Sequence, residues 1–158
     1  METEEPVDEE QSICEVAHGS PEYWATVDLR DAILRKPLGL QFSPEELEAE
    51  RISHHVACYR GDRLVGCLVL SPLESGDVRM KQVAVVSEVQ GRGIGTALAK
   101  YAEALASRRG YRRMVLHARD TAVTFYERLG YSTVGDQFEE VTILHWKMEK
   151  RLTDFKDE

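Results

Sequence analysis

The sequence predicts a single α/β domain in which antiparallel and parallel strands share one sheet. Extended segments at residues 54–60, 63–70 and 77–86 follow one another with short connections, as in an antiparallel meander. A glycine-rich loop and an apolar-periodic helix at residues 93–109 come next. The strand expected at residues 112–118 follows that helix, so a right-handed crossover would place it parallel to the 77–86 strand.

Two helices are expected before the meander, because each begins with a capping signal. Ser20-Pro21-Glu22 supplies an N-cap residue, a proline at the first helical position and an early acid, which predict a helix to about residue 35. Ser43-Pro44-Glu45-Glu46 reads as a capping box and predicts a second helix over residues 43–51. A short strand is expected before both helices, at residues 12–17.

The remaining elements carry weaker signals. Gly61-Asp62 between two extended segments favours a type II′ hairpin. A helix is expected over residues 121–129, because Gly130 can end it. Alternation predicts a last strand at residues 141–148, and residues 132–135 are a further strand candidate.

Composition and charge limit the classes of protein to which this chain can belong. The chain has 158 residues and a net charge of −8, but residues 1–10 hold six acids and no base, so the rest is nearly neutral. We expect a disordered acidic tail at 1–11, one domain at 12–149 and a charged tail at 150–158. A nearly neutral domain argues against nucleic-acid binding. No apolar run is long enough for a membrane span and the start is acidic, so we expect a cytoplasmic protein without membrane contact.

The cysteines and histidines give no metal signal. Cys14, Cys58 and Cys67 are odd in number and lack the spacing of metal ligands, so we expect reduced thiols in or near the core. His54 and His55 are expected to be structural or exposed. We therefore predict no metal site.

The glycine-rich loop is the strongest functional signal. Gly91, Gly93 and Gly95 follow an apolar run and precede the helix, so their amides and the helix N-terminus should form an anion site suited to a phosphate. No lysine follows the glycines, as a P-loop would require. The third glycine comes one residue early for a dinucleotide fingerprint, and the preceding strands look like a hairpin.

Two motifs resemble those of the GNAT N-acetyltransferase superfamily. Gln90-x-x-Gly93-x-Gly95 resembles the acetyl-CoA signature [Gln/Arg]-x-x-Gly-x-[Gly/Ala]. The later run Arg119-x-x-Ala122-x-x-Phe125-Tyr126-x-x-x-Gly130-Tyr131 is similar to the second signature, with Arg119 in place of the common Asn. The resemblance covers about residues 12–149. Its departure at position 119 puts the acceptor chemistry in question.

The resemblance implies a GNAT fold, with a mixed sheet of six or seven strands and helices on both faces, and acetyl-CoA as cofactor. Its fourth and fifth strands would splay apart to admit the pantetheine arm, and the loop at 36–42 would cover the acceptor site. The implied cofactor-binding residues are Val83, Ala84, Val85, Gln90, Gly91, Arg92, Gly93, Ile94, Gly95, Thr96 and Tyr126. Small bacterial GNAT proteins also share a segment that looks like residues 138–145.

Acetyl transfer to an amine assigns further candidates. By family position Tyr126 is the acid for the leaving thiolate, and the Val83 N–H is the donor to the oxyanion. The base is open among Glu139, Glu140, His145 and His117, and we select Glu140. Gln82, His117, Arg119 and His145 are the expected substrate contacts.

The sequence predicts a cytoplasmic acetyl-CoA-dependent N-acetyltransferase whose acceptor is a small primary amine. A protein N-terminus or lysine remains an alternative acceptor. A non-catalytic acyl-CoA-binding sensor of the same fold is the alternative function, and a Rossmann-type nucleotide binder is a third. A homodimer is also expected, without an identified surface.

Overall fold

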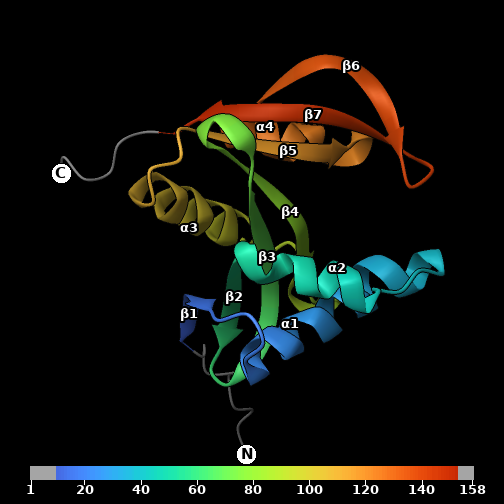
Figure 1. The fold of residues 1–158 in the computed structure, drawn as a ribbon. Helices are drawn as coiled ribbons and strands as arrows, with labels where there is room; N and C mark the ends of the chain where they lie inside the picture. The colour runs from blue at the N-terminus through green and yellow to red at the C-terminus, as the bar shows by residue number, and fades with distance from the viewer. Residues whose placement is uncertain (1–9, 153–158) are drawn as a thin grey trace, which may run out of the picture.

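The computed structural model describes residues 10–152, which form one seven-stranded mixed sheet (Figure 1). Its order is β1-β2-β3-β4-β5-β7-β6, and every neighbouring pair is antiparallel except the parallel pair β4 and β5. The strands are β1 (Gln11–Val16), β2 (His54–Arg60), β3 (Arg63–Pro72), β4 (Asp77–Val85), β5 (Arg113–Arg119), β6 (Ser132–Glu140) and β7 (Ile143–Arg151). The predicted mixed α/β fold is confirmed. The acidic segment at residues 1–9 lies outside the described residues.

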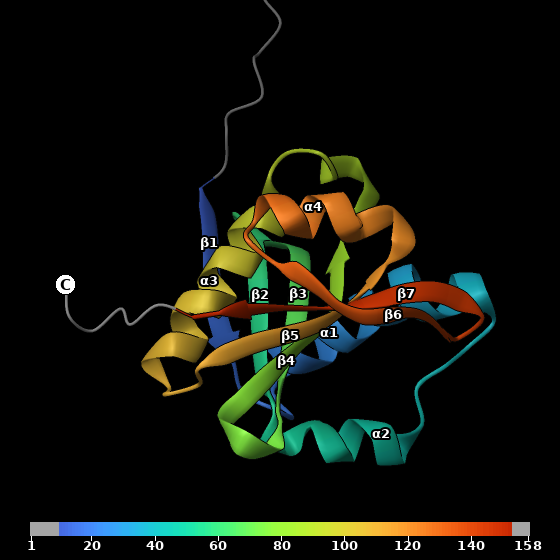
Figure 2. The ribbon, with the colours of Figure 1, turned by 90° about the horizontal axis from the view of Figure 1, so that it is seen from above.

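Helices cover both faces of the sheet, as Figure 2 shows from above. The four α-helices are α1 (Pro21–Arg30), α2 (Pro44–Ala49), α3 (Ile94–Arg108) and α4 (Val123–Arg128). Helices α1 and α2 lie on one face, and α3 and α4 lie on the other. A π-helical turn, Asp31–Arg35, and a 3₁₀ turn, Lys36–Leu38, extend α1 toward α2. No helix among residues 10–152 has the length and hydropathy to cross a membrane.

The predicted capping signals start the first two helices. Ser20 accepts a hydrogen bond from the Tyr23 amide at 3.1 Å. Ser43 and Glu46 form a reciprocal capping box, with both hydrogen bonds at 3.0 Å. Each cap satisfies amides that the first helical turn leaves without partners.

The face of the sheet under α3 holds an apolar core. Alternate residues of the strands point to this face and bury against α3 and Tyr131 of the segment that follows α4. Its largest fully buried side chains include Leu68, Leu70, Leu98, Met114, Leu116 and Met148. A Cβ at Gly66 would lie 2.9 Å from the Leu98 Cδ1 atom, so glycine at this position lets α3 approach β3 closely.

The opposite face buries a polar cluster beneath α1. Arg30 is fully buried, and its two terminal nitrogens bond the Glu50 carboxylate at 2.8 Å each. Tyr23 donates to the same carboxylate at 2.8 Å, and the His55 Nε2 atom lies 2.9 Å from the Glu50 carbonyl oxygen. His55 is therefore structural and buried, not exposed.

This cluster also reaches the strand that lines the cavity described below. The Arg30 Nη1 atom donates to the Gln82 side-chain oxygen at 2.6 Å. Burial alone would raise the pKa of Glu50, but the hydrogen bonds and charge of Arg30 outweigh burial and lower it. Glu50 therefore stays ionised at neutral pH and holds Arg30 against Gln82.

The C-terminal hairpin is longer than the sequence predicts. Strand β6 runs to Glu140 instead of ending at residue 135, and β7 runs to Arg151, so the predicted tail at 150–158 begins too early. Strand β7 continues because Lys150 and Arg151 still pair with the start of β5, and the Lys150 ammonium also donates to Glu103 at 2.9 Å and to the Leu129 carbonyl at 2.7 Å. Cys14 is exposed, whereas Cys58 and Cys67 are buried as expected.

The buried ion pair generates a stability prediction. Glu50→Gln should lower the free energy of unfolding by about 3 kcal/mol, because it leaves the Arg30 charge buried without a counter-charge. Since the folded-state pKa of Glu50 is lowered, its contribution is present above the unfolded-state pKa and is lost as the pH falls through the folded-state pKa. Urea unfolding at pH 7 and at acidic pH measures both effects.

The matched control is Glu48→Gln, because Glu48 pairs with Arg51 at 3.7 Å on the exposed surface. That change should alter stability by less than about 1 kcal/mol. Equal losses for the two variants would contradict a special role of the buried pair.

Candidate functional site

The two parallel strands separate soon after they begin. Strand β4 pairs with β5 only through Asp77–Arg79, opposite Arg113–Val115. Beyond Arg79, β4 continues beside β3 alone, so its other edge has no partner strand among residues 10–152. A cavity of about 480 Å³ opens where the strands diverge. The predicted splay of these strands is therefore present.

A bulge in β4 shapes one wall of the cavity. The register between β3 and β4 shifts between Cys67 and Val69, and Gln82 on the opposing strand has a positive φ of 54°. Such a bulge re-aims the side chains that follow it. Gln82 and Val83 line the cavity, and the hydrogen bond from Arg30 holds Gln82 in place.

The glycine loop joins the end of β4 to α3 and carries free amides. Gly91 and Gly93 both have a φ of 84°, which side-chain-bearing residues rarely adopt. Helix α3 starts without a side-chain cap. Among residues 10–152, no acceptor pairs with the amides of Gly91, Gly93, Ile94, Gly95 and Thr96. A row of unpaired amides at a helix N-terminus fits a phosphate group.

The two polar side chains of the loop differ in their surroundings. Gln90 donates from its side-chain nitrogen to the Val85 carbonyl at 2.9 Å, so it ties the loop to the end of β4. Arg92 is exposed, and its side chain forms no hydrogen bond or ion pair within residues 10–152, which leaves its guanidinium available for a phosphate. A Cβ at Gly95 would lie 3.5 Å from Phe125, which places the loop beside α4.

Tyr126 of α4 lines the cavity. Its ring meets those of Phe125 and Tyr131 edge-on, at centroid distances of 4.9 Å and 5.7 Å. Burial raises the pKa of Tyr126 to about 12, so the phenol is protonated at neutral pH. Within the described part of the chain its hydroxyl has no hydrogen-bond partner, and it is therefore free to donate to a ligand.

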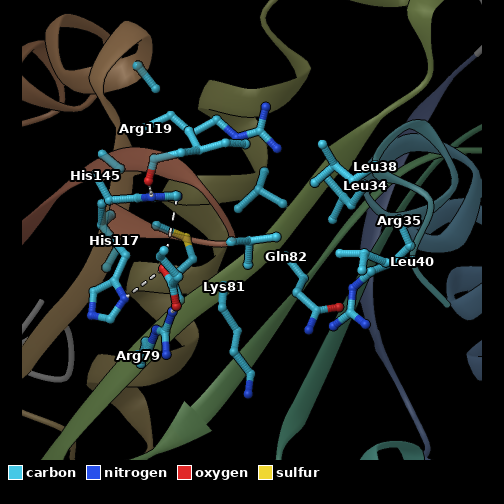
Figure 3. A pocket seen from close by; sticks show the side chains of 18 of the residues that line it. Leu34, Arg35, Leu38, Leu40, Arg79, Lys81, Gln82, His117, Arg119 and His145 are labelled. Atoms are coloured by element: carbon cyan, nitrogen blue, oxygen red, sulfur yellow. Dashed lines mark hydrogen bonds and ion pairs between the residues drawn. The ribbon is translucent and has the colours of Figure 1, made fainter. Parts of the chain in front are cut away.

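Three further candidates converge from three strands. The His117 Nδ1 atom of β5 lies 3.3 Å from the Glu140 Oε1 atom of β6, and the His145 Nε2 atom of β7 lies 3.9 Å from the same oxygen. The Arg79 Nη2 atom approaches the other carboxylate oxygen at 3.6 Å. Figure 3 shows His117, His145 and Arg79 gathered on this side of the cavity. Glu139 points to the opposite face of β6, is exposed and does not line the cavity.

Hydrogen bonding sets the tautomers of both imidazoles. The His145 Nδ1 atom lies 2.8 Å from the Ile143 carbonyl, which can only accept, so Nδ1 carries the proton. His117 likewise presents its Nδ1 proton to the Glu140 carboxylate. Burial and then the Arg79 charge lower the pKa of His117, while Glu140 opposes both effects. His117 is therefore neutral at pH 7 and keeps an unprotonated nitrogen.

Several other lining residues were not predicted individually, although Leu38 and Leu40 lie in the loop at 36–42 that was expected to cover the acceptor site. Arg79 and Lys81 contribute from β4, and the segment after α1 supplies Leu34, Arg35, Leu38 and Leu40, which Figure 3 shows across from the strands. Alternation along β4 could have placed Arg79 and Lys81 on one face. Arg119 and His145 line the cavity, whereas Ala84 and Val85 do not.

The charge environment of His117 generates a titration prediction. Glu140→Gln should lower the pKa of His117 further, because it removes the charge that favours the imidazolium, and Arg79→Met should raise it. Imidazole NMR signals measured against pH give both shifts. His55, which contacts Glu50 instead, should titrate identically in all forms. A His117 titration that Glu140→Gln leaves unchanged would contradict the observed pairing.

Several known proteins are similar to this chain in sequence and in fold. An uncharacterised acetyltransferase of Streptococcus pyogenes is 30% identical over 80 residues, which span 45% of this chain and 55% of that protein. The match therefore covers about half the length of that relative. An uncharacterised N-acetyltransferase of Bacillus subtilis is 26% identical over 123 residues, covering 77% of this chain and 87% of the relative.

Solved structures extend the likeness over nearly the whole domain. A crystal structure from Lactobacillus plantarum that is assigned as an N-acetyltransferase has 26% identity and a TM-score of 0.79, covering 90% of this chain and 99% of that one. An aminoglycoside 6′-N-acetyltransferase complexed with coenzyme A shares the fold at a TM-score of 0.75 and 22% identity, covering 89% and 96%. The acetyltransferase (GNAT) domain family itself matches residues 31–152. Because that match covers most of the chain, this protein belongs to the GNAT acetyltransferase family.

Proposed function

We propose that this protein transfers the acetyl group of acetyl-CoA to the primary amine of a small molecule, by direct attack in a ternary complex. One observation carries the proposal. A single cavity joins the unpartnered edge of β4, the phenol of Tyr126 and the polar group of Glu140, His117 and His145. The glycine loop, with its free amides, begins at the end of the same strand.

The chain's own groups fit acetyl-CoA as a co-substrate. The free amides of Gly91 and of residues 93–96 would hold its pyrophosphate, and the exposed Arg92 side chain would add a charge. The free edge of β4 from Val83 to Val85 would pair with the amides of its pantetheine arm, as an added strand does. Bound in this way, acetyl-CoA supplies an acetyl thioester.

Each chemical role then falls to a residue that lines the cavity. The Val83 amide would donate to the developing oxyanion. Glu140 would accept the proton of the attacking amine, alone or together with the hydrogen-bonded His117. Tyr126 would hold a proton for the departing thiolate, which its raised pKa allows at neutral pH. Gln82, Arg119 and His145 would contact the acceptor.

A non-catalytic sensor of acyl-CoA is the alternative function. The free loop amides would serve a sensor equally well, but it would need neither the Tyr126 phenol nor the Glu140 group in the cavity. The third function, a Rossmann-type nucleotide binder, disagrees with the topology, because only β4 and β5 pair in parallel among residues 10–152. A cytoplasmic location and a homodimer remain predictions.

The decisive experiment is acetyl-CoA turnover against a panel of primary amines, with thiol release as the readout and CoA binding measured in parallel. We expect CoA binding together with thiol release on one class of small amine. Binding without release on any small amine, but with release on a peptide, would replace the small acceptor by a protein acceptor. Binding with no release at all favours the sensor, and the absence of CoA binding contradicts the proposal.

Tyr126→Phe tests the proposed acid. The change removes one hydroxyl, so it should lower kcat roughly a hundredfold while CoA affinity stays within about twofold. Tyr101→Phe on α3 is the matched control, because Tyr101 does not line the cavity, and it should leave kcat unchanged. An unchanged kcat in Tyr126→Phe would remove the acid assignment and leave the fold and cofactor site intact.

A further inference from the structure

The cavity is unusually basic for a site that must receive an amine. Four basic side chains line it, from three parts of the chain: Arg35, Arg79, Lys81 and Arg119. Only two carboxylates line it, those of Glu46 and Glu140. A cavity with this excess of positive charge attracts anions and repels cations.

The two carboxylates are already engaged by two of the basic residues. Arg35 pairs with Glu46 at 3.2 Å, and Arg79 approaches Glu140 at 3.6 Å. Lys81 and Arg119 have no ion pair within residues 10–152. The excess charge of the cavity therefore resides on these two residues.

Lys81 occupies an unfavourable position for a lysine without a partner. It is half-buried on β4, directly before the Gln82 bulge and on the same face as Arg79. Burial lowers the pKa of Lys81, and the charges of Arg79 and Arg30 lower it further, while Glu50 and Glu46 only partly oppose them. An ammonium in such surroundings is stabilised when a ligand brings an anionic group to it.

Arg119 adds a second cation at the rim. It ends β5, and its exposed side chain lines the cavity opposite Lys81 in Figure 3. It also stands where the second motif commonly has Asn, so this chain carries a full positive charge at that position. Arg119, in place of the common Asn, and the unpaired Lys81 therefore both add positive charge to the cavity.

From these charges we infer that the acceptor is an amine that also carries an anionic group, a carboxylate or a phosphate, which Lys81 binds while the amine lies toward Glu140 and His117 and the charge of Arg119 adds to the attraction. The inference rests on the proposed function and narrows it. Polyamines and aminoglycosides are disfavoured as acceptors, because each brings several positive charges into a cavity that already has an excess. Amino acids and phosphorylated amines are favoured.

The test compares amines that differ only in the anionic group. Phosphoethanolamine is paired with ethanolamine, and β-alanine with its amide, so that the two pairs distinguish phosphate from carboxylate; spermidine is the polycationic probe. Thiol release gives kcat/KM for each amine. Calorimetric titration of the same amines into CoA-loaded protein gives their affinities without requiring turnover.

We expect the anionic member of at least one pair to be favoured roughly tenfold or more, which is the range of a charge-assisted hydrogen bond. Lys81→Met should abolish this preference, and Lys81→Arg should retain most of it. Lys147→Met is the matched control, because Lys147 is exposed on β7 and does not line the cavity. It should leave the preference unchanged.

The outcomes separate this inference from the proposed function. Equal use of charged and neutral members, or spermidine as the best acceptor, overturns the inference while the acetyltransferase function stands. A preference that persists in Lys81→Met also overturns the assignment of this residue. If no amine is acetylated, the calorimetric arm decides: tighter binding of the anionic members supports the inference although the catalytic proposal has failed, and equal binding overturns both.

Discussion

The site depends on the early end of the pairing between β4 and β5. Backbone amides and carbonyls of a strand require hydrogen-bond partners, and β4 loses its partner strand on one side after Arg79. The Gln90 side chain satisfies the Val85 carbonyl, and the rest of that edge is left to water or to an extended ligand. The crossover from β4 to β5 passes through the glycine loop and α3, so the free loop amides begin where the free edge ends. One change in sheet geometry thus provides both halves of an elongated binding site.

The polar cluster under α1 fixes the conformation of the β4 bulge that forms one wall of the cavity. A buried ion pair is seldom more stabilising than an apolar pair of equal volume, so the Arg30–Glu50 pair is a poor device for stability alone. An apolar pair, however, could not form a hydrogen bond with the side-chain oxygen of Gln82. Because Arg30 bonds Gln82 at 2.6 Å, the positive φ at the bulge is supported by a charge that is itself fixed by Glu50. The buried guanidinium of Arg30 therefore positions Gln82 in the wall of the cavity.

Local signals predicted the elements that local chemistry determines. Serine caps, prolines and the loop glycines act within a few residues, so α1, α2 and the loop appear where they were expected. The turn at Val141 and Thr142 carries no such signal, because both residues adopt positive φ values of 51° and 59° without Gly or Asn. The length of β6 was missed for this reason. Lys81 was missed because its proposed role depends on which face β4 presents and on its lacking a carboxylate partner among residues 10–152.

The charges of the cavity bear on the chemistry as well as on recognition. An amine must lose its proton before it attacks, and nearby positive charges favour the neutral form of a bound amine. In the proposed reaction, Lys81, Arg119 and Arg79 would therefore reduce the demand on a base. This matches a Glu140 carboxylate that is already shared between His117 and Arg79 and a His117 that is neutral at pH 7. Basic residues that repel an ammonium at a distance thus assist the same group as a nucleophile, provided that its own anionic group has brought it into the cavity.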